Sequence, residues 1–216
     1  MIKLIQQTKT SYEKIASPFS ASRKQIWPVM EGFAQEIAKG SLVLDLGCGN
    51  GRILELLKQT EIEYLGIDFC EPLLEEARKL YPETKFELLD FTKDLNKLSK
   101  SDYIVSIAAL HHIPTKALRL KVFRELKSLL RPPGKLLFTV WNLRQPKYRK
   151  YLYLSRLKNF FRYGWNDTFI PWGKQVERYY HAFSPRELKK LLQKAGFEIE
   201  KLEYDSKKHN LVVIAH

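Results

Sequence analysis

The stretch from Leu42 to Gly51, which reads LVLDLGCGNG, constrains the fold of this chain more than any other. Its apolar first half is typical of a buried strand, and its second half is a glycine-rich turn that opens a helix near Arg52. Three glycines at alternate positions, Gly47, Gly49 and Gly51, let the backbone approach a ligand closely. The stretch therefore predicts a nucleotide-type binding turn at the carboxyl end of a strand.

The spacing of these glycines separates two kinds of nucleotide site. A dinucleotide fingerprint needs a glycine at position 52, where this chain has Arg52, and the chain has no Gly-Lys-Ser/Thr phosphate loop. The pattern D-x-G-x-G-x-G, which begins at Asp45 and includes Cys48, resembles motif I of class I S-adenosylmethionine (SAM) methyltransferases. A carboxylate at Asp45 suits the cationic head of SAM better than it would suit a phosphate. The alternative is an ordinary strand–turn–helix whose glycines serve only the turn.

Side chains at the ends of the next strands complete the predicted cofactor site. Asp68 lies 21 positions after the first glycine of the turn, a spacing at which a carboxylate can accept hydrogen bonds from ribose hydroxyls. Asp90 is placed to accept from an adenine amino group and Phe91 to cover the adenine face, with a turn cap as the alternative for Asp90. The predicted cofactor-binding residues are Asp45, Gly47, Cys48, Gly49, Gly51, Asp68, Phe69, Asp90, Phe91 and Ala108.

Strand-like and helix-like segments alternate along the chain. Apolar runs predict strands at 42–46, 63–68, 85–90, 103–109 and 135–141, and a closing pair at 197–204 and 211–215. Amphipathic helical patterns lie between them. This alternation predicts one domain over residues 1–216 with an α/β fold, a doubly wound, seven-stranded and mostly parallel sheet of the Rossmann-like class I methyltransferase type.

Two segments fall outside this alternation. Residues 1–40 precede the first strand and predict a short helix at 11–15, a break at 17–23 and a second helix at 27–38. Such a segment either closes over a ligand as a lid or simply covers the sheet. Residues 142–182 form an insertion after the fifth strand.

The insertion at 142–182 is basic and aromatic. It holds nine Lys or Arg and eleven aromatic residues, but only Asp167 and Glu177 as acids. Such a composition is typical of surfaces that hold phosphates and stack bases, whereas the other interpretation is a helical cap packed on the sheet. The whole chain has 37 Lys and Arg against 24 Asp and Glu, and its formal charge of +13 favours a polyanionic partner.

Cysteine usage and hydropathy indicate the compartment. Two cysteines, Cys48 and Cys70, make no disulfide framework and favour a reducing environment. The N-terminus has no apolar signal core, and the longest apolar run, 104–110, is too short to span a bilayer. We expect a cytoplasmic protein with no membrane partner and no bound metal.

Motifs outside the glycine turn carry a closer resemblance. The chain resembles the Trm9/ALKBH8-type tRNA methyltransferases, which methylate the carboxymethyl group on the wobble uridine of tRNA. The matching residues are Ile15-Ala16, Phe19-Ser20-x-Ser22-Arg23, Trp27-Pro28, Ser106-Ile107-Ala108-x-Leu110-His111-His112, Arg124-Glu125-Leu126, Leu130-Arg131-Pro132-x-Gly134, Val140-Trp141-x-x-x-Gln145, Pro171-Trp172, Arg178-Tyr179-Tyr180-His181-x-Phe183 and Asn210.

The resemblance implies a function and a set of residues. SAM is the implied cofactor, S-adenosylhomocysteine (SAH) the product and tRNA the partner, and eukaryotic relatives also need a small zinc-binding activator protein. The implied catalytic residues are Arg23, His112 and Arg178. The implied substrate-binding residues are Trp27, His111, Trp141, Trp172, Tyr179 and His181.

The chain departs from the family pattern in two places. Pro133 stands where the family usually has glycine, and the loop after Asp90 reads Phe-Thr-Lys-Asp. Two other functions stay open at this point. A small-molecule O- or N-methyltransferase would share the cofactor residues without needing the insertion, and a binding protein for SAM or RNA would lack catalysis.

Overall fold

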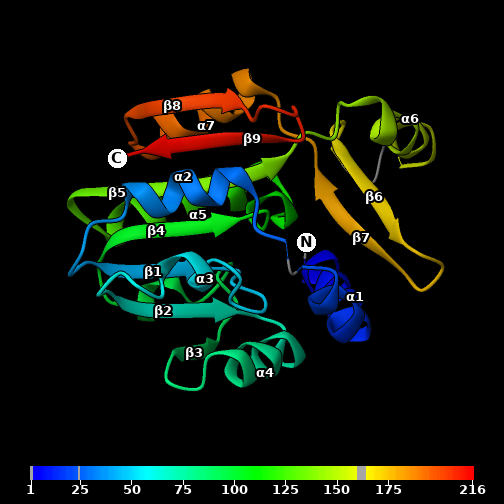
Figure 1. Cartoon of the computed structure of the whole chain (residues 1–216). Coiled ribbons are helices and arrows are strands. Elements are labelled where there is room, and N and C mark those ends of the chain that lie inside the picture. Colours follow the sequence, from blue (N-terminus) through cyan, green and yellow to red (C-terminus); the bar gives the residue numbers. More distant parts are fainter. Residues whose placement is uncertain (1, 24, 160–163) are drawn as a thin grey trace.

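A central seven-stranded sheet organises the computed structural model, which describes residues 2–23, 25–159 and 164–216 (Figure 1). The strand order is β3-β2-β1-β4-β5-β9-β8; the first five are parallel, and β9 runs antiparallel to both β5 and β8. The doubly wound, mostly parallel sheet is therefore confirmed. The strands are β1 Leu42–Leu46, β2 Glu63–Asp68, β3 Lys85–Leu88, β4 Ser101–Ile107, β5 Leu130–Trp141, β8 Ile199–Tyr204 and β9 Asn210–Ala215.

Helices cover both faces of this sheet. Because side chains alternate along a strand, Val43 of β1 packs in one apolar cluster and its neighbour Leu44 in another. The Val43 cluster holds side chains of α2 (Pro28–Glu36), α3 (Leu54–Leu57) and α4 (Glu71–Leu80). The Leu44 cluster holds side chains of α5 (Lys116–Leu129) and α7 (Pro185–Ala195). Among the described helices, none is long and apolar enough to cross a membrane.

The N-terminal helix is longer than the sequence predicts. Helix α1 runs from Ile2 to Ala21 without the expected break, with Pro18 in its last turns. A proline removes only its own N–H from the helix ladder, and packing can outweigh that loss. Tyr12 and Ile15 are buried in a cluster with residues of α4, and α1 also contacts β7. In Figure 1, α1 lies on the side toward which the parallel strands point.

The insertion folds into a helix and a hairpin. Helix α6 spans Pro146–Asn159, and β6 (Asp167–Trp172) pairs antiparallel with β7 (Val176–His181). The hairpin was not predicted; its apolar side chains lie among basic ones, so no clean alternation marks the strands. The aromatic residues at positions 160, 161 and 163, which the sequence analysis counts in this insertion, lie outside the described residues.

Candidate functional site

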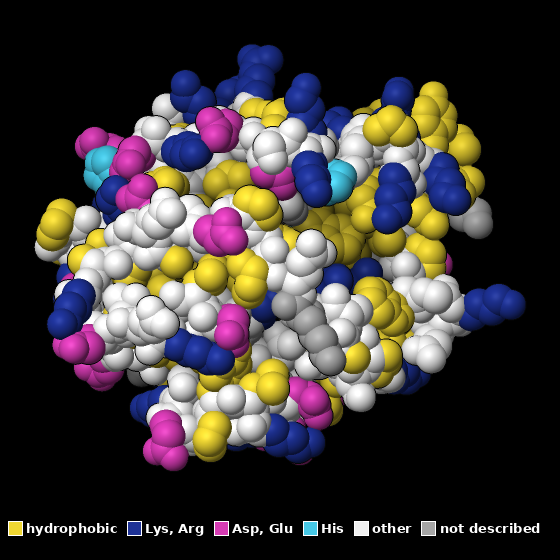
Figure 2. Space-filling view, viewed as in Figure 1, with side chains coloured by type: hydrophobic (Ala, Val, Ile, Leu, Met, Phe, Trp, Pro, Cys, Tyr) yellow, Lys and Arg dark blue, Asp and Glu magenta, His cyan; other side chains and the backbone are white. Residues whose placement is uncertain are grey.

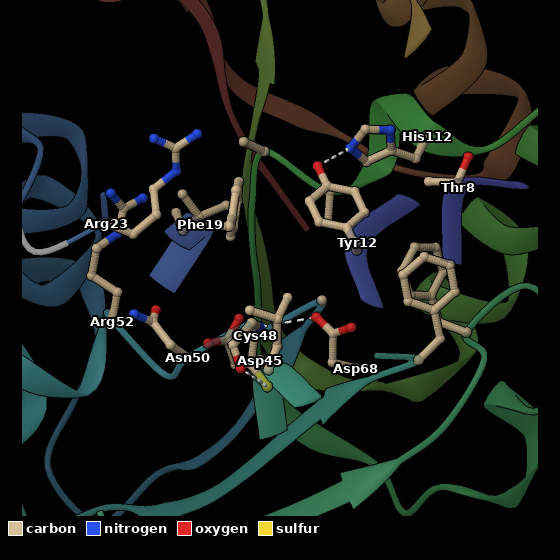
Figure 3. Close-up of a pocket in the computed structure, with 18 of the residues that line it drawn as sticks. Thr8, Tyr12, Phe19, Arg23, Asp45, Cys48, Asn50, Arg52, Asp68 and His112 are labelled. Carbon is tan, nitrogen blue, oxygen red and sulfur yellow. Dashed lines mark hydrogen bonds between the residues drawn. The ribbon is translucent and has the colours of Figure 1, made fainter. Parts of the chain in front are cut away.

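A cavity opens at the carboxyl ends of β1, β2 and β4, between the glycine turn and α1 (Figure 3). Parallel strands that end at one edge of a sheet bring their following loops together there. Most of the predicted site residues line this cavity. They are Arg23, Trp27, Asp45, Gly47, Cys48, Gly49, Asp68, Phe69, Asp90, Phe91, Ala108, His112, Trp141 and Arg178.

The glycine turn forms the floor of the cavity. Gly47 has φ +73°, and a Cβ there would lie 2.5 Å from the Cβ of Ala109, so only glycine fits. The Gly49 N–H donates to Oδ2 of Asp68 at 2.9 Å. Gly51 does not line the cavity; it lies behind the turn, where a Cβ would meet the ring of Phe86 at 3.2 Å. Gly51 therefore serves the conformation of the turn and does not line the ligand site.

Two buried carboxylates face this floor. Asp68 accepts from the backbone N–H groups of Gly49 and Cys70, each at 2.9 Å, and Asp45 accepts from the Tyr64 hydroxyl at 2.7 Å. Burial raises the pKa of Asp45 to about 7 and that of Asp68 to about 6. Within the described chain, neither carboxylate makes an ion pair. Two unpaired acids beside Gly47, a position that admits no Cβ, fit the positive charge and ribose of SAM.

Asp90 lines the cavity but already caps a turn. Its Oδ1 accepts from the Thr92 N–H at 3.0 Å and from the Thr92 hydroxyl at 2.6 Å, and Oδ2 pairs with Lys93 at 3.0 Å. These contacts match the capping alternative that the sequence left open. Phe91 is buried beside Gly47, where it can cover an aromatic ligand.

Arg178 lies at the other end of the cavity, in an aromatic box. Its side chain is only 2% exposed, and its Cζ lies 5.2–5.7 Å from the ring centres of Tyr12, Trp141, Trp172 and Tyr180. Its Nε has no hydrogen-bond partner, and no carboxylate in the described chain pairs with its guanidinium. A buried cation without an anion is costly, and this arrangement favours an anionic ligand.

Arg23 adds a second cation to this end of the cavity. Its Cζ lies 4.5 Å from the ring centre of Phe19 and 5.8 Å from that of Trp172. Burial lowers the pKa of Arg23, and nearby Arg178 acts in the same direction. Like Arg178, it has no acidic partner among the described residues.

His112 is held as a neutral imidazole. Its Nδ1 lies 2.6 Å from the Tyr179 carbonyl oxygen, and its Nε2 lies 2.8 Å from the Tyr12 hydroxyl. Burial lowers the pKa of His112 to about 3, so the ring is uncharged at neutral pH. A carbonyl oxygen can only accept, so the hydrogen sits on Nδ1 and Nε2 accepts from Tyr12. His112 therefore offers no positive charge to a ligand.

Four residues that the resemblance implied for substrate binding lie outside the cavity, namely Trp172, which lines a neighbouring groove, and His111, Tyr179 and His181. His111 is 1% exposed, and its Nδ1 accepts from the Trp141 N–H at 3.1 Å. Tyr179 and His181 belong to β7, where alternation turns them away from the side that Arg178 occupies. The sequence run from 178 to 181 looks like one motif, but a strand divides it between two faces.

His181 instead joins the insertion to α7. Its Nδ1 lies 2.7 Å from Oδ1 of Asp167, and its Nε2 lies 2.7 Å from Oε1 of Glu187. His181 is 3% exposed and Asp167 is 8% exposed. His181 therefore links β6, β7 and α7, which fixes the hairpin that carries Arg178.

A groove continues outward from the cavity along the insertion. The two share Arg23, Trp27, Trp141 and Arg178, and Trp172, which does not line the cavity, belongs to the groove. The Trp141 ring stacks on Tyr148 with centroids 5.7 Å apart. Figure 2 shows Lys and Arg side chains among apolar ones over α6. Other groove residues are Gln145, Lys147, Lys150, Tyr151, Lys207 and His209.

Several cavity residues were not predicted from the sequence. Tyr12 and Thr8 come from α1, and Asn50 and Arg52 follow the glycines of the turn. Arg52 donates to the Gln25 carbonyl at 3.2 Å and lies over the Trp27 ring at 4.3 Å. The sequence signal that points to Tyr12 is its position three residues before the motif Ile15-Ala16, on the same helix.

Comparisons with known proteins agree with the geometry. A family model described as "Methyltransferase domain" matches residues 23–202. A Schizosaccharomyces pombe tRNA (carboxymethyluridine(34)-5-O)-methyltransferase is 32% identical over 94% of this chain and 93% of its own length. The Saccharomyces cerevisiae protein of the same name is also 32% identical, over 74% of this chain and 54% of its own length.

Solved structures share the fold. A SAM-dependent methyltransferase of Methanosarcina mazei has a TM-score of 0.71 and 21% identity, covering 88% of this chain and 97% of that one. A Haloferax volcanii methyltransferase, solved in complex with the Trm112 methyltransferase activator, has a TM-score of 0.68 and 15% identity over 96% of each chain.

The raised pKa of Asp45 predicts that substitution of this residue stabilises the fold, and that the gain in stability depends on pH. The native state keeps this proton up to about pH 7, whereas the unfolded chain loses it near pH 4. Asp45 therefore lowers stability as pH rises from about 4 to 7. We expect Asp45→Asn to raise the free energy of unfolding by about 2 to 4 kcal/mol at pH 8 and little at pH 4, and to weaken SAM binding at least tenfold.

Denaturant titration at both pH values and calorimetric titration with SAM measure these effects. Glu61→Gln, which alters an exposed ion pair with Lys39, is the control and should behave alike at both pH values. An Asn variant that gains no more stability at pH 8 than at pH 4 would contradict the assigned burial of this charge.

The contacts of His181 predict a structural effect on substitution. His181→Ala removes the imidazole partner of Oδ1 of Asp167 and leaves this buried carboxylate with the Gly164 N–H on Oδ2, so we expect the free energy of unfolding to fall by about 2 kcal/mol. SAM affinity should stay within twofold, because His181 does not line the cavity. Thermal denaturation and calorimetry test this, with exposed His209→Ala as the control. Weaker SAM binding at unchanged stability would argue for a direct role in the site.

Proposed function

This chain belongs to the tRNA (carboxymethyluridine(34)-5-O)-methyltransferase family of SAM-dependent methyltransferases, and we propose that it methyl-esterifies a carboxymethyl group on the wobble uridine of tRNA. The fission yeast relative bears this activity in its name and aligns with nearly the whole chain. We also propose a cytoplasmic location, which the assignment of tRNA as substrate supports.

The observation that carries the proposal is the unpaired cation of Arg178. A carboxylate on the substrate would supply the anion that the protein itself does not provide there. A guanidinium can bind a carboxylate through two parallel N–H···O bonds, which fixes orientation as well as charge. Arg23 lines both the cavity and the groove, so it can bind the same carboxylate together with Arg178.

The groove supports RNA as the carrier of this carboxylate. It leads from Arg23 and Arg178 onto Lys147, Lys150 and the stacked Trp141–Tyr148 pair. Lysines suit phosphates, and aromatic faces suit unstacked bases of a loop. A small acceptor would leave this surface without a use.

The proposed reaction needs little acid–base catalysis from the protein. SAM, when bound, supplies an electrophilic methyl group. A carboxylate is already ionised near neutral pH, so its attack needs no general base. The residues of the chain bind and orient: Arg178 and Arg23 hold the carboxylate, and neutral His112 packs beside them. Helix α1 and the aromatic box exclude water, which favours an in-line approach.

We also propose a small activator protein of the Trm112 type as a partner. The support is the family membership and the similarly folded Haloferax volcanii methyltransferase, which was solved with such an activator. Methyl transfer assayed with and without an added activator tests this part separately.

Labelled methyl transfer to tRNA tests the proposed reaction. The protein and labelled SAM are mixed with total tRNA from a host lacking this gene, and nucleosides are analysed by mass spectrometry. We expect a methyl ester on a wobble uridine. Label on another base would keep RNA as substrate and refute the carboxylate mechanism; SAM binding without label in tRNA, even with an activator, would move the assignment to a small-molecule acceptor.

Arg178→Lys tests the proposed anchor for the carboxylate. Lysine keeps the charge but lacks the planar fork, so we expect kcat/KM to fall roughly 30-fold or more. SAM affinity should stay within twofold. Arg124→Lys, on the exposed face of α5, is the matched control and should retain wild-type turnover. Unchanged turnover in the Arg178 variant would remove this residue from the mechanism.

A further inference from the structure

Tyr12 of α1 touches both Arg178 and His112, although these two residues come from distant parts of the chain. Its hydroxyl oxygen lies 3.3 Å from Nη1 of Arg178 and 2.8 Å from Nε2 of His112. Tyr12 is 8% exposed and lines the cavity. Figure 3 shows it opposite the glycine turn, with its hydroxyl directed at His112.

Donors and acceptors fix a direction along this chain of contacts. The Tyr179 carbonyl accepts the His112 Nδ1 hydrogen, so His112 Nε2 must accept. Tyr12 therefore donates its one hydroxyl hydrogen to His112. Its oxygen lone pairs then face Arg178, which can only donate. The partners therefore fix the direction of all three hydrogen bonds: His112 donates to Tyr179, Tyr12 donates to His112, and Arg178 donates to Tyr12.

The hydroxyl of Tyr12 accepts the one hydrogen bond that the side chain of Arg178 makes within the described residues. The Nε of Arg178 has no hydrogen-bond partner, and the faces of the aromatic rings around the guanidinium are not directional acceptors. Cation–π contacts tolerate rotation of the guanidinium within its plane, whereas a hydrogen bond does not. The orientation of the fork thus depends on one oxygen atom carried by α1.

Helix α1 meets β7 through a second contact that does not reach the cavity. The Ser11 hydroxyl donates to the Glu177 carbonyl at 2.9 Å, one residue before Arg178. Ser11 does not line the cavity. Ser11 and Tyr12 are neighbours with different contacts. Ser11 holds α1 on the hairpin, whereas Tyr12 orients the guanidinium of Arg178, so substitutions at the two positions distinguish these effects.

We propose that Tyr12 is a positioning residue for methyl transfer, through which α1 aligns Arg178 and His112 for the acceptor carboxylate. The proposal rests on the proposed function in taking that carboxylate as the ligand of Arg178. Ile5 and Thr8 of the same helix line the cavity that holds the cofactor residues. Helix α1 therefore joins the cofactor site to the acceptor site, and the acceptor site is complete only with α1 in place.

Tyr12→Phe is the direct test, with Ser11→Ala as the matched control. Phenylalanine keeps the ring contacts to Phe19 and His112 and removes only the hydroxyl. We expect kcat on carboxymethylated tRNA to fall about tenfold, with KM for tRNA and affinity for SAM within threefold. Ser11→Ala should keep kcat within twofold. Equal losses in both variants, or none in Tyr12→Phe, would overturn the proposal.

A spectroscopic measurement makes the test independent of turnover. The ¹⁵N resonance of His112 Nε2 should move toward that of an imidazole nitrogen without a hydrogen bond in Tyr12→Phe and stay in place in Ser11→Ala. A resonance that does not move in Tyr12→Phe would refute the contact itself. Wild-type protein without turnover on carboxymethylated tRNA would count against the proposed function, while this resonance would still decide the role of Tyr12.

Discussion

Unpaired charge at both ends of one cavity is the constraint on which the site depends. Asp45 and Asp68 lie at the sheet end, and Arg23 and Arg178 lie at the insertion end. Opposite charges in a small volume would normally pair with each other. Here the fold keeps them apart, because the acids are held by the glycine turn and Tyr64, whereas the arginines are held by aromatic rings and Tyr12.

This separation needs support from uncharged groups. Backbone N–H groups stabilise Asp68 in its ionised form, and aromatic faces stabilise a guanidinium without neutralising it. The insertion supplies two of these rings, Trp172 and Tyr180, and the contacts of His181 with Asp167 and Glu187 keep its hairpin in place. A residue outside the cavity therefore contributes to the charge pattern inside it.

Local patterns explain why the cofactor half was predictable. The D-x-G-x-G-x-G turn, the apolar strands and the acid at Asp68 are all set by neighbours within about twenty positions. The prediction of a break near Pro18 was wrong because packing on α4 and β7 holds α1 together, and propensity alone does not include such packing.

The acceptor half depended on contacts that sequence spacing does not contain. Tyr179 and His181 follow Arg178 in the sequence, yet strand geometry places them on the opposite face. Tyr12 meets His112 across 100 positions and Arg178 across 166, so only the folded chain brings the three together. The resemblance named Arg178 and His112 but could not reveal what orients them.

Helix α1 contributes to both halves of the site. Helix α1 packs against α4, which follows the strand that carries Asp68, and against β7, which carries Arg178. A displacement of α1 would open the cofactor cavity and remove the hydrogen bond of Arg178 together. Since the orientation of the guanidinium depends on that bond, an open cavity would lack an ordered acceptor site. Such an arrangement would confine ordered binding of the acceptor to the closed site, where water is excluded as well.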